Sequence, residues 1–551
     1  MPQLRKQPQG VVNSCTTVPP PTQGLNTTGD IADMSPSDAI ELDNFIAQDL
    51  GLQMRTGWFE YATNIGGGPT TTIRTVMAYN GTPSNASANP LASSQLFAAI
   101  DTGIYFIEGG GNLIAASPVM ALSGTPNAGT FSWVMFTAGG GAQYLVACSE
   151  TDGGFIYDGI TWTKMVSTGS GPGHITGVNP AQFAQVCVWK RRLMFTLRAS
   201  SQCWFLPVNV VGGAAAVFDF GPQLLNGGAL IGLTNWTQDD GAGIDDRLVI
   251  LGSAGDLVIY AGTDPSNADA FSNVGVWYIG QPPVGRRSMT TSGGNVYILT
   301  QFGVIPVNQI VQGGLDNILT SDTGLLVQLR KLQSLLNEDF QTLINTDGWE
   351  LLALPGLALL HIARPSTSVN ENIQYVFQQH QTAWSRLLAV PGKTYMRRLN
   401  EVYAGTSDGR VLRVFSGNVD GLKLDGTGAT SITARCTPAF NYLNMPTVQK
   451  QALMLRLNFI AQAQPAWGLL MNTDFSVSTI DVTPAATTSI GSLWDAAFWD
   501  QDKWAGGAAA YGEWRSVEGL GFALSPSIFV SSNAQTTLAS IEYMVKAGGP
   551  L

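Results

Sequence analysis

The residue types that most often carry enzyme chemistry are sparse in this sequence. It contains three histidines, His174, His361 and His380, and no two of them have a spacing typical of metal ligands. The G-x-x-x-x-G-K-[ST] loop that binds phosphates is missing. A pair of glycosidase carboxylates stays open, because its two members can lie far apart in sequence. We expect no enzymatic activity, no metal and no cofactor.

Pairs of adjacent arginines are the more informative charged feature. Each pair stands just before a predicted strand, and together they hold six of the 28 basic residues. If repeated units place them on one rim, they could face a phosphate backbone. The alternative is that they keep hairpin ends soluble and prevent edge pairing. The pairs are Arg191 and Arg192 in "WKRRLMF", Arg286 and Arg287 in "GRRSM", and Arg397 and Arg398 in "MRRLNEVYAG".

Tryptophans recur at five-residue intervals in "SLWDAAFWDQDKWAGG", at Trp494, Trp499 and Trp504. This spacing turns successive side chains by about 140° on a helix and places them on alternate faces of a strand, so no regular face collects all three. A flat sugar-binding platform is therefore not expected. WD-type repeats are excluded too, because their dipeptide recurs once per blade. We predict that the three rings anchor this stretch in the C-terminal domain or on a neighbouring subunit.

The composition indicates a β-rich protein of several domains. Charged residues make up 12% and hydrophobic residues 44% of the 551 residues, and 63 are glycine. The net charge of -11 argues against a general nucleic-acid binder. Five dispersed cysteines without a CxxC motif indicate synthesis in a reducing cytoplasm. The start lacks a secretory signal, and the longest apolar run, from Leu351, is too short to span a membrane.

A repeated strand–turn–strand pattern predicts a β-propeller. Short apolar strands flank turns in which glycine accompanies Asp or Asn, and the distances between these turns fit a unit of about 40 to 50 residues. Unrelated hairpins in β-sandwiches are the alternative. The turn glycines are Gly103, Gly154, Gly255, Gly294 and Gly409.

The remaining segments complete an all-β architecture. Residues 1–60 are expected to form an extended Pro-rich arm and one short helix that begins at Ser35 and Pro36. Residues 61–436 are assigned to the propeller, with one inserted helix near 325–340 whose leucines share a face. Residues 437–551 are expected to form an additional β domain, because long Thr-, Ser- and Ala-rich stretches replace the earlier pattern.

Three ordered strings resemble tail-associated structural proteins of short-tailed bacteriophages, the tail nozzle or tail tubular protein B-like family. The first follows G-[LV]-N, M-x-P-x-D-A-x-x-L-x-N and R-x-G-[WY] in "GLNTTGDIADMSPSDAIELDNFIAQDLGLQMRTGW". The second runs from "WKRRLMF" through "CWFLP" and "WTQDDG" to "YAGTDP", and the third from "QYVFQQHQTAWSR" to "VYAGTSDGRVLRV". The likeness covers residues 23 to 415. One departure is that Thr382 directly precedes Ala383, where such proteins usually carry an intervening glycine.

The resemblance implies a non-enzymatic subunit of a homohexameric ring, a nozzle that retains packaged DNA and guides its ejection. It implies contacts with portal and adaptor proteins, tail fibres or spikes, and transiently with double-stranded DNA, in a virion tail assembled in the host cytoplasm. The alternative is a receptor-binding or polysaccharide-degrading tail protein, which the 14 tryptophans and an incomplete Asp-box at "YDGITW" favour.

Overall fold

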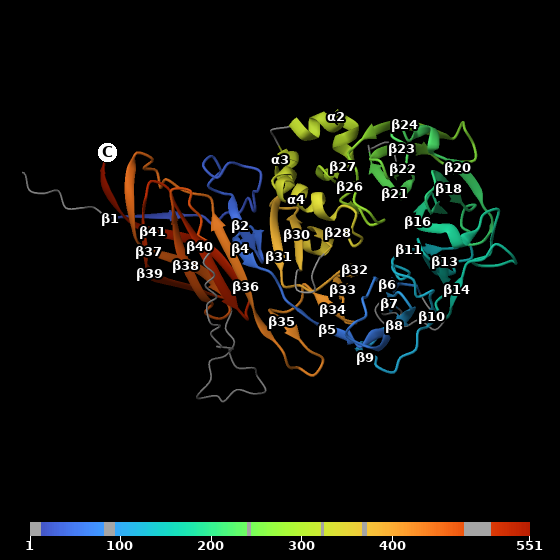
Figure 1. Ribbon diagram of the computed structural model, residues 1–551, viewed down its shortest axis with the longest axis horizontal. Coiled ribbons are helices and arrows are strands. Elements are labelled where there is room, and N and C mark those ends of the chain that lie inside the picture. Colours follow the sequence, from blue (N-terminus) through green and yellow to red (C-terminus); the bar gives the residue numbers. More distant parts are fainter. Residues whose placement is uncertain are drawn as a thin grey trace, which may run out of the picture.

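The computed structural model describes residues 13–81, 94–239, 244–320, 324–365, 372–478 and 508–550. Nearly all of their regular structure is β-strand, which confirms the predicted all-β class. Figure 1 shows a ring of small sheets beside a second β-rich part that carries β1 (Asn13–Val18) and the C-terminal end of the chain.

The ring consists of radially arranged antiparallel sheets. The first three sheets, blades one to three, contain β6 (Thr75–Tyr79), β7 (Gln95–Ile100), β8 (Gly103–Phe106) and β10 (Met120–Ala121); β11 (Phe131–Thr137), β12 (Gln143–Ser149), β13 (Gly153–Tyr157) and β14 (Trp162–Lys164); and β16 (Phe183–Trp189), β17 (Arg192–Leu197), β18 (Gln202–Phe205) and β20 (Ala216–Asp219). Blades four and five contain β21 (Leu230–Asp239), β22 (Ile244–Gly252), β23 (Asp256–Gly262) and β24 (Phe271–Tyr278); and β25 (Met289–Ser292), β26 (Asn295–Thr300) and β27 (Gly303–Pro306). Blades six and seven contain β28 (Glu350–Leu354), β29 (Leu359–Ala363), β30 (Ile373–Gln378) and β31 (Ala383–Leu388); and β32 (Thr394–Arg398), β33 (Glu401–Gly405), β34 (Val411–Val414) and β5 (Trp58–Thr63).

Neighbouring inner strands contact one another in a closed order: β6, β11, β16, β21, β25, β28, β32 and again β6. The described residues thus form a β-propeller of seven blades. The sequence predicted a β-propeller but not the number of blades. All five turn glycines lie at hairpins inside blades. The repeat is longer than predicted in most blades: successive inner strands begin between 44 residues (Glu350 to Thr394) and 61 residues (Met289 to Glu350) apart.

The last blade joins both ends of the propeller sequence. β5 precedes the first blade in the chain, yet it pairs antiparallel with β34 and forms the outer strand of the seventh blade. This pairing closes the ring, because blade seven needs residues from both ends. Further short strands lie outside the blades: β9 (Gly111–Asn112), β15 (Ile175–Thr176) and β19 (Gly213–Ala214).

The prediction of a single inserted helix near 325–340 is wrong, because the inserted region contains three helices. The structure has α2 (Val307–Thr320), α3 (Gly324–Arg330) and α4 (Gln333–Leu343). The predicted helix is interrupted at Lys331, whose carbonyl accepts hydrogen bonds from the backbone N–H of Thr27 (2.7 Å) and from its hydroxyl (2.8 Å). The predicted apolar face is nevertheless used, since Leu329, Leu332 and Leu336 are buried.

The short helix predicted from Ser35 is also absent. Ser35 to Asp38 form a turn, closed by a hydrogen bond from the Asp38 N–H to the Ser35 carbonyl, and strands β2 (Ala39–Asp43), β3 (Phe45–Gln48) and β4 (Gly51–Met54) follow. The helix-start residues are overridden by tertiary pairing, because β2 lies between β31 and β36 (Thr430–Pro438). Asn44, with φ of 58°, separates β2 from β3.

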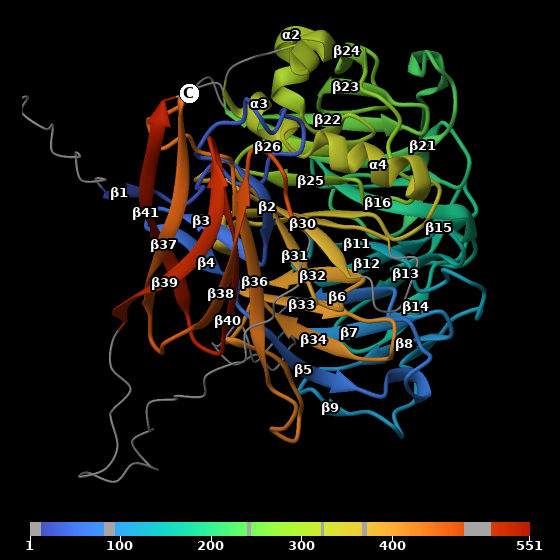
Figure 2. The same cartoon turned by 60° about the vertical axis from the view of Figure 1, so that its left-hand side comes forward.

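The second part of the molecule is a two-layer β-sandwich built from both chain ends. One layer has the order β3-β4-β41-β37-β39, with β1 also on β41; the other contains β36, β40 and β38, which continue through β2 and β35 (Val419–Leu422) to the sixth and seventh blades. The inner faces share one apolar core. The strands are β37 (Val448–Ala461), β38 (Ala466–Thr473), β39 (Ala509–Gly521), β40 (Leu524–Ser532) and β41 (Thr536–Pro550). Figure 2 shows β37, β39 and β41 side by side.

Buried ion pairs join this sandwich to the propeller. Arg55 binds Asp420 through both guanidinium nitrogens, at 2.8 and 2.5 Å, and its side chain is only 1% exposed. Asp43 binds Arg386 of β31 at 2.6 and 2.8 Å, and Asp38 binds Lys331 at 2.6 Å. A buried charge is costly without a partner, so these pairs fix the N-terminal segment in one position.

Removing the acid of the most deeply buried pair should be strongly destabilising. Asp420→Asn leaves the Arg55 guanidinium buried without its counter-charge, and we expect a loss of about 3 to 5 kcal/mol in the free energy of unfolding. Glu513→Gln is the control, because the Arg515–Glu513 pair is solvent-exposed and should contribute less than about 1 kcal/mol. Urea denaturation of both variants measures the difference; equal midpoints would contradict the expectation.

Candidate site in the propeller channel

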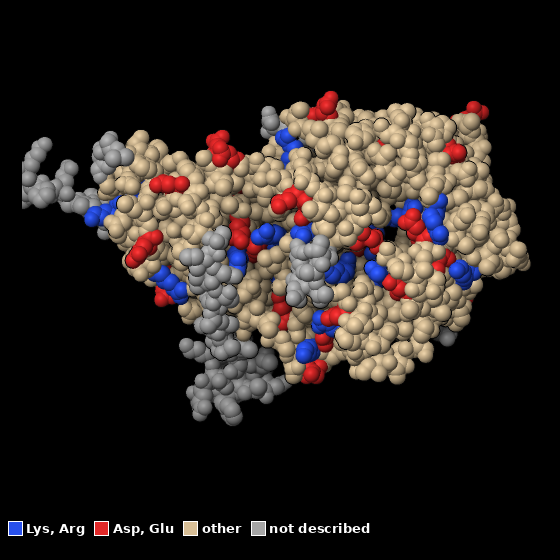
Figure 3. Space-filling model, in the orientation of Figure 1, with Lys and Arg blue, Asp and Glu red and all other residues tan. Residues whose placement is uncertain are grey.

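Cavities lie at the centre of the propeller, and Arg286 and Arg287 line three of them. Two have volumes of about 240 Å³ each and lie where the chain enters the inner strands; the third, about 440 Å³, runs along the inner strands. Figure 3 shows charged side chains gathered around a hollow in the middle of the propeller, on a face that is otherwise largely uncharged. We call Arg286 and Arg287 the central arginine pair.

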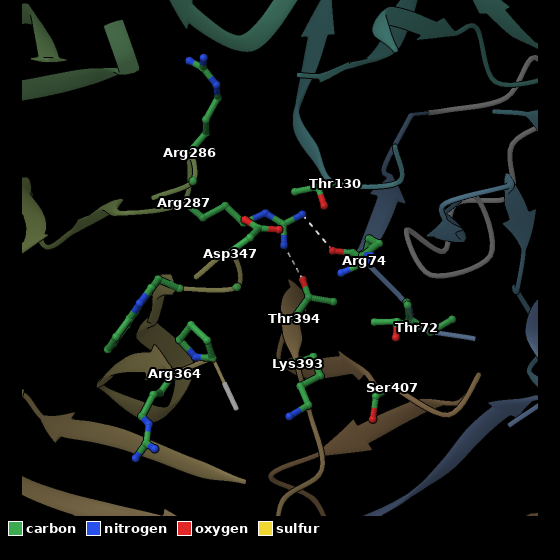
Figure 4. Close-up of a pocket in the computed structure, with 15 residues that line it drawn as sticks. Thr72, Arg74, Thr130, Arg286, Arg287, Asp347, Arg364, Lys393, Thr394 and Ser407 are labelled. Carbon is green, nitrogen blue, oxygen red and sulfur yellow. Dashed lines mark hydrogen bonds between the residues drawn. The ribbon is translucent and has the colours of Figure 1, made fainter. Parts of the chain in front are cut away.

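Arg287 connects the blades on one side of the channel. Its guanidinium donates to the hydroxyl of Thr394 at 2.8 Å (Figure 4) and to the hydroxyl of Thr75 at 2.6 Å, a residue that the figure does not draw. It also donates to two backbone carbonyls and to a carboxylate: Arg74 and Phe131 at 3.1 Å each, and Glu350 at 3.5 Å. Thr75, Phe131, Glu350 and Thr394 begin the first, second, sixth and seventh blades, and Arg74 directly precedes the first.

Arg286 points away from Arg287 and connects the opposite side (Figure 4). It donates to the carbonyls of Leu230 and Ile231, both at 2.9 Å, which begin the fourth blade. It also donates to the Thr196 hydroxyl of the third blade at 3.2 Å and pairs with Glu150 of the second blade at 3.2 Å. Two consecutive residues of the loop entering the fifth blade therefore contact all six other blades.

Acidic groups compensate much of the positive charge at this site. Burial raises the pKa of Glu350, and the nearby Arg287 opposes this rise. Two further basic residues of the first cavity also have acidic partners: Arg74 binds Asp101 at 3.0 Å, and Arg364 binds Asp339 at 3.1 Å. This arrangement favours cross-linking of the blades over display of bare positive charge.

The other predicted arginines are distributed unevenly. Arg397 is exposed and lines the largest cavity together with the central pair. Arg398 is buried and binds Glu108 at 3.1 Å on the first blade. Arg191 is exposed at the β16–β17 turn, and Arg192 binds Asp264 at 2.9 Å. The structure thus brings three of the six residues to the channel and leaves three elsewhere, and DNA contact by any of them stays a prediction.

Sequence reasoning missed several cavity-lining residues. Arg74, Asp347 and Lys393 line the first cavity. Arg74 and Lys393 directly precede the inner strands β6 and β32, and Asp347 lies three residues before β28. A usable signal was available, since a charged residue just before a blade's first strand lies at the channel mouth. The predicted anchors Trp494, Trp499 and Trp504 lie outside the described residues.

Other chemistry has little support in the part of the chain that the structure describes. It contains no group of three or more His, Cys, Asp or Glu side chains arranged to hold a metal ion. Ser407 lies in a "GTSDG" string, but this string forms the β33–β34 hairpin and not the strand-to-helix turn that presents a serine nucleophile. None of the described helices is long and apolar enough to cross a membrane.

Comparison with known proteins gives no family. No protein-family model matches the chain, and no curated protein matches it. Among solved structures, it is similar to the extracellular domain of a one component system from B. thetaiotaomicron, at 11% identity and a TM-score of 0.36, over 66% of this chain and 40% of that chain. It is also similar to BBS1N in complex with ARL6DN, at 12% identity and a TM-score of 0.38, over 67% of this chain and 99% of that chain. A third similar structure is a quinonprotein alcohol dehydrogenase-like protein from Bacteroides thetaiotaomicron VPI-5482, at 12% identity and a TM-score of 0.32, over 58% of this chain and 67% of that chain. These likenesses carry no argument about function.

The central arginine pair should matter for stability. Arg287→Gln removes donors from buried acceptors in four blades, and we expect a loss of about 3 kcal/mol or more in the free energy of unfolding. Arg397→Gln in the same channel should change it by less than about 0.5 kcal/mol, because Arg397 is exposed. Chemical denaturation compares the two; a small effect of Arg287→Gln would show that the blades hold together without it.

A buried histidine predicts a pH dependence of stability. His361 in β29 is fully buried beside Tyr395, and burial lowers its pKa to about 4, although the hydrogen bond that its Nε2 donates to the Gln374 side-chain oxygen opposes this. The unfolded chain therefore takes up this proton first as the pH falls below about 6.5. Stability should decrease by up to about 3 kcal/mol between pH 6.5 and 4. His361→Gln should remove this part of the dependence in denaturation curves at several pH values.

Proposed function

We propose that this chain is a structural subunit of the tail nozzle or tail tube of a short-tailed bacteriophage. Several copies would form a ring-shaped conduit that retains packaged DNA and guides its ejection. The support comes from the resemblance of three sequence strings to such proteins and from the place where the first of these strings lies in the fold.

The observation that carries the proposal is that the N-terminal string forms a buried junction. Asp38 and Asn44 are 2% and 3% exposed, and Leu42 is fully buried. Arg55 holds Asp420 and also donates to the Leu388 carbonyl at 3.1 Å. The residues that carry the resemblance thus connect the sandwich, the helical insert and the last two blades. An ordered match at such a junction supports a shared architecture more strongly than scattered identities would.

A close approach of two backbones explains one motif position. A side chain at Gly57 would place its Cβ 1.8 Å from the Val419 carbonyl oxygen, so only glycine fits. Trp58, the next residue, pairs with Val414 of β34 and with Asp420 of β35. The R-x-G-W string is therefore explained by the closure of the seventh blade, which supports the structural role proposed for the chain.

The proposed partners follow from this role. They are further copies of the chain, the portal and adaptor proteins, tail fibres or spikes, and DNA that passes transiently. The proposed location is the virion tail, after synthesis in the host cytoplasm. Among the six arginines, Arg191 and Arg397 are the exposed ones; because Arg397 lines the propeller channel, Arg191 is our leading residue for DNA contact. An overall charge of -11 favours passage over retention by binding.

Assembly provides the test. Electron microscopy of the purified chain mixed with its adaptor ring should show closed annuli, and particles that lack the chain should package DNA but fail to retain it. Persistent monomers that never join a tail would contradict the proposal. The alternative of a glycan-binding or glycan-degrading protein predicts binding or cleavage of host polysaccharide by the isolated chain, so a panel of these polysaccharides is assayed in parallel.

A further inference from the structure

The sandwich has two strand edges without backbone partners in the described residues. β39 is 13 residues long and pairs only with β37. On the other side, β1 pairs only with β41. No described backbone hydrogen bond reaches the outer edge of either strand. A long edge of this kind is a template for pairing with another strand.

The two edges lie at opposite ends of the same row of residues. Cys15 is opposite Met544, Met544 is opposite Met454, and Met454 is opposite Ser516. Residues directly opposite in neighbouring strands share a face of the sheet. Cys15 and Ser516 are both exposed. One row therefore runs across the sheet and ends in an accessible small side chain at each edge.

The strand directions allow these edges to pair between copies. β1 is antiparallel to β41, β41 to β37, and β37 to β39, so β1 and β39 run in opposite directions. A rotation about an axis parallel to the strands keeps their direction. It brings β39 of one copy against β1 of the next in antiparallel orientation, and such a head-to-tail contact forms a ring when the rotation between copies divides a full turn.

The register also fits a second copy. With Cys15 opposite Ser516 and the two strands antiparallel, the six residues of β1 would lie opposite residues 513–518 of β39. β1 has the sequence NSCTTV and carries no charged side chain, so Glu513, Arg515 and Glu518 would meet no like charge across the pairing.

We propose that β39 of one copy binds β1 of a second copy, and that this pairing joins the subunits into a continuous sheet. The inference rests on the proposed function only for the existence of a ring. In a closed ring, neighbouring copies are not displaced along the ring axis. Cys15 at the end of the row in one copy therefore lies opposite Ser516 at the end of the same row in the next copy.

A disulfide test follows directly. In full-length chain, Ser516→Cys should form a disulfide with Cys15 of the neighbouring copy, since directly opposed residues place Cβ atoms about 4.5 to 5.5 Å apart. The other four cysteines are buried. We expect most of the oxidised protein to run as a ladder of multimers on a non-reducing gel. Adding Cys15→Ser should return it to monomer.

Ala510→Cys is the matched control. Ala510 is exposed on the same face of β39 but lies six residues from Ser516, about 20 Å along the strand, so it should not cross-link to Cys15. Closed rings in the electron microscope without cross-links from Ser516→Cys would overturn the inference and leave the nozzle proposal standing. Cross-links that persist without Cys15 would also overturn it, because they indicate β39–β39 pairing.

Cross-links that need both cysteines, in a preparation without closed rings, would support the strand pairing and reject the nozzle proposal. Absence of both rings and cross-links would reject both. Each outcome therefore separates the interface from the function proposed for the assembly.

Discussion

Two adjacent guanidinium groups hold the propeller together at its centre. Blades of a propeller pack through their faces, and their inner strands leave a channel that the side chains must fill or bridge. Arg286 and Arg287 bridge it, because a guanidinium offers five donors in a fixed fork and suits several acceptors at once. Their acceptors are carbonyls, hydroxyls and carboxylates of the six other blades. The central charge is thereby satisfied inside the fold.

The N-terminal segment imposes the second constraint. It supplies β5 to the seventh blade and β1 to β4 to the sandwich, so neither part is complete without it. Three buried ion pairs, formed by Asp38, Asp43 and Arg55, hold it against the helical insert, the sixth blade and β35. Since removing one partner of such a pair leaves an uncompensated buried charge, this segment tolerates little change in sequence.

Local sequence patterns predicted the β-propeller architecture well, but they did not predict which residues contact one another across the fold. The turn glycines marked blade hairpins, and three of them, Gly255, Gly294 and Gly409, have the positive φ that a tight turn often requires. The helix start at Ser35 was misleading, because β2 gains more from pairing with strands about 350 and 400 residues away in sequence. The arginine pairs were correctly placed beside strands. Their partners were beyond reach, since Arg287 meets Thr75, 212 residues earlier in the chain.

The same central pair bears on where DNA would pass. The central arginine pair bridges the channel to all six other blades, so the middle of one propeller offers no open passage for a double helix. A conduit would therefore have to form between copies and not inside one propeller. In the pairing proposed above, β1 and β39 join the sandwiches of neighbouring copies, whereas the inner strands of the propeller already form a closed ring within one copy. On the nozzle proposal, the sandwiches would then form the continuous part of the conduit wall, and the propellers would lie beside them.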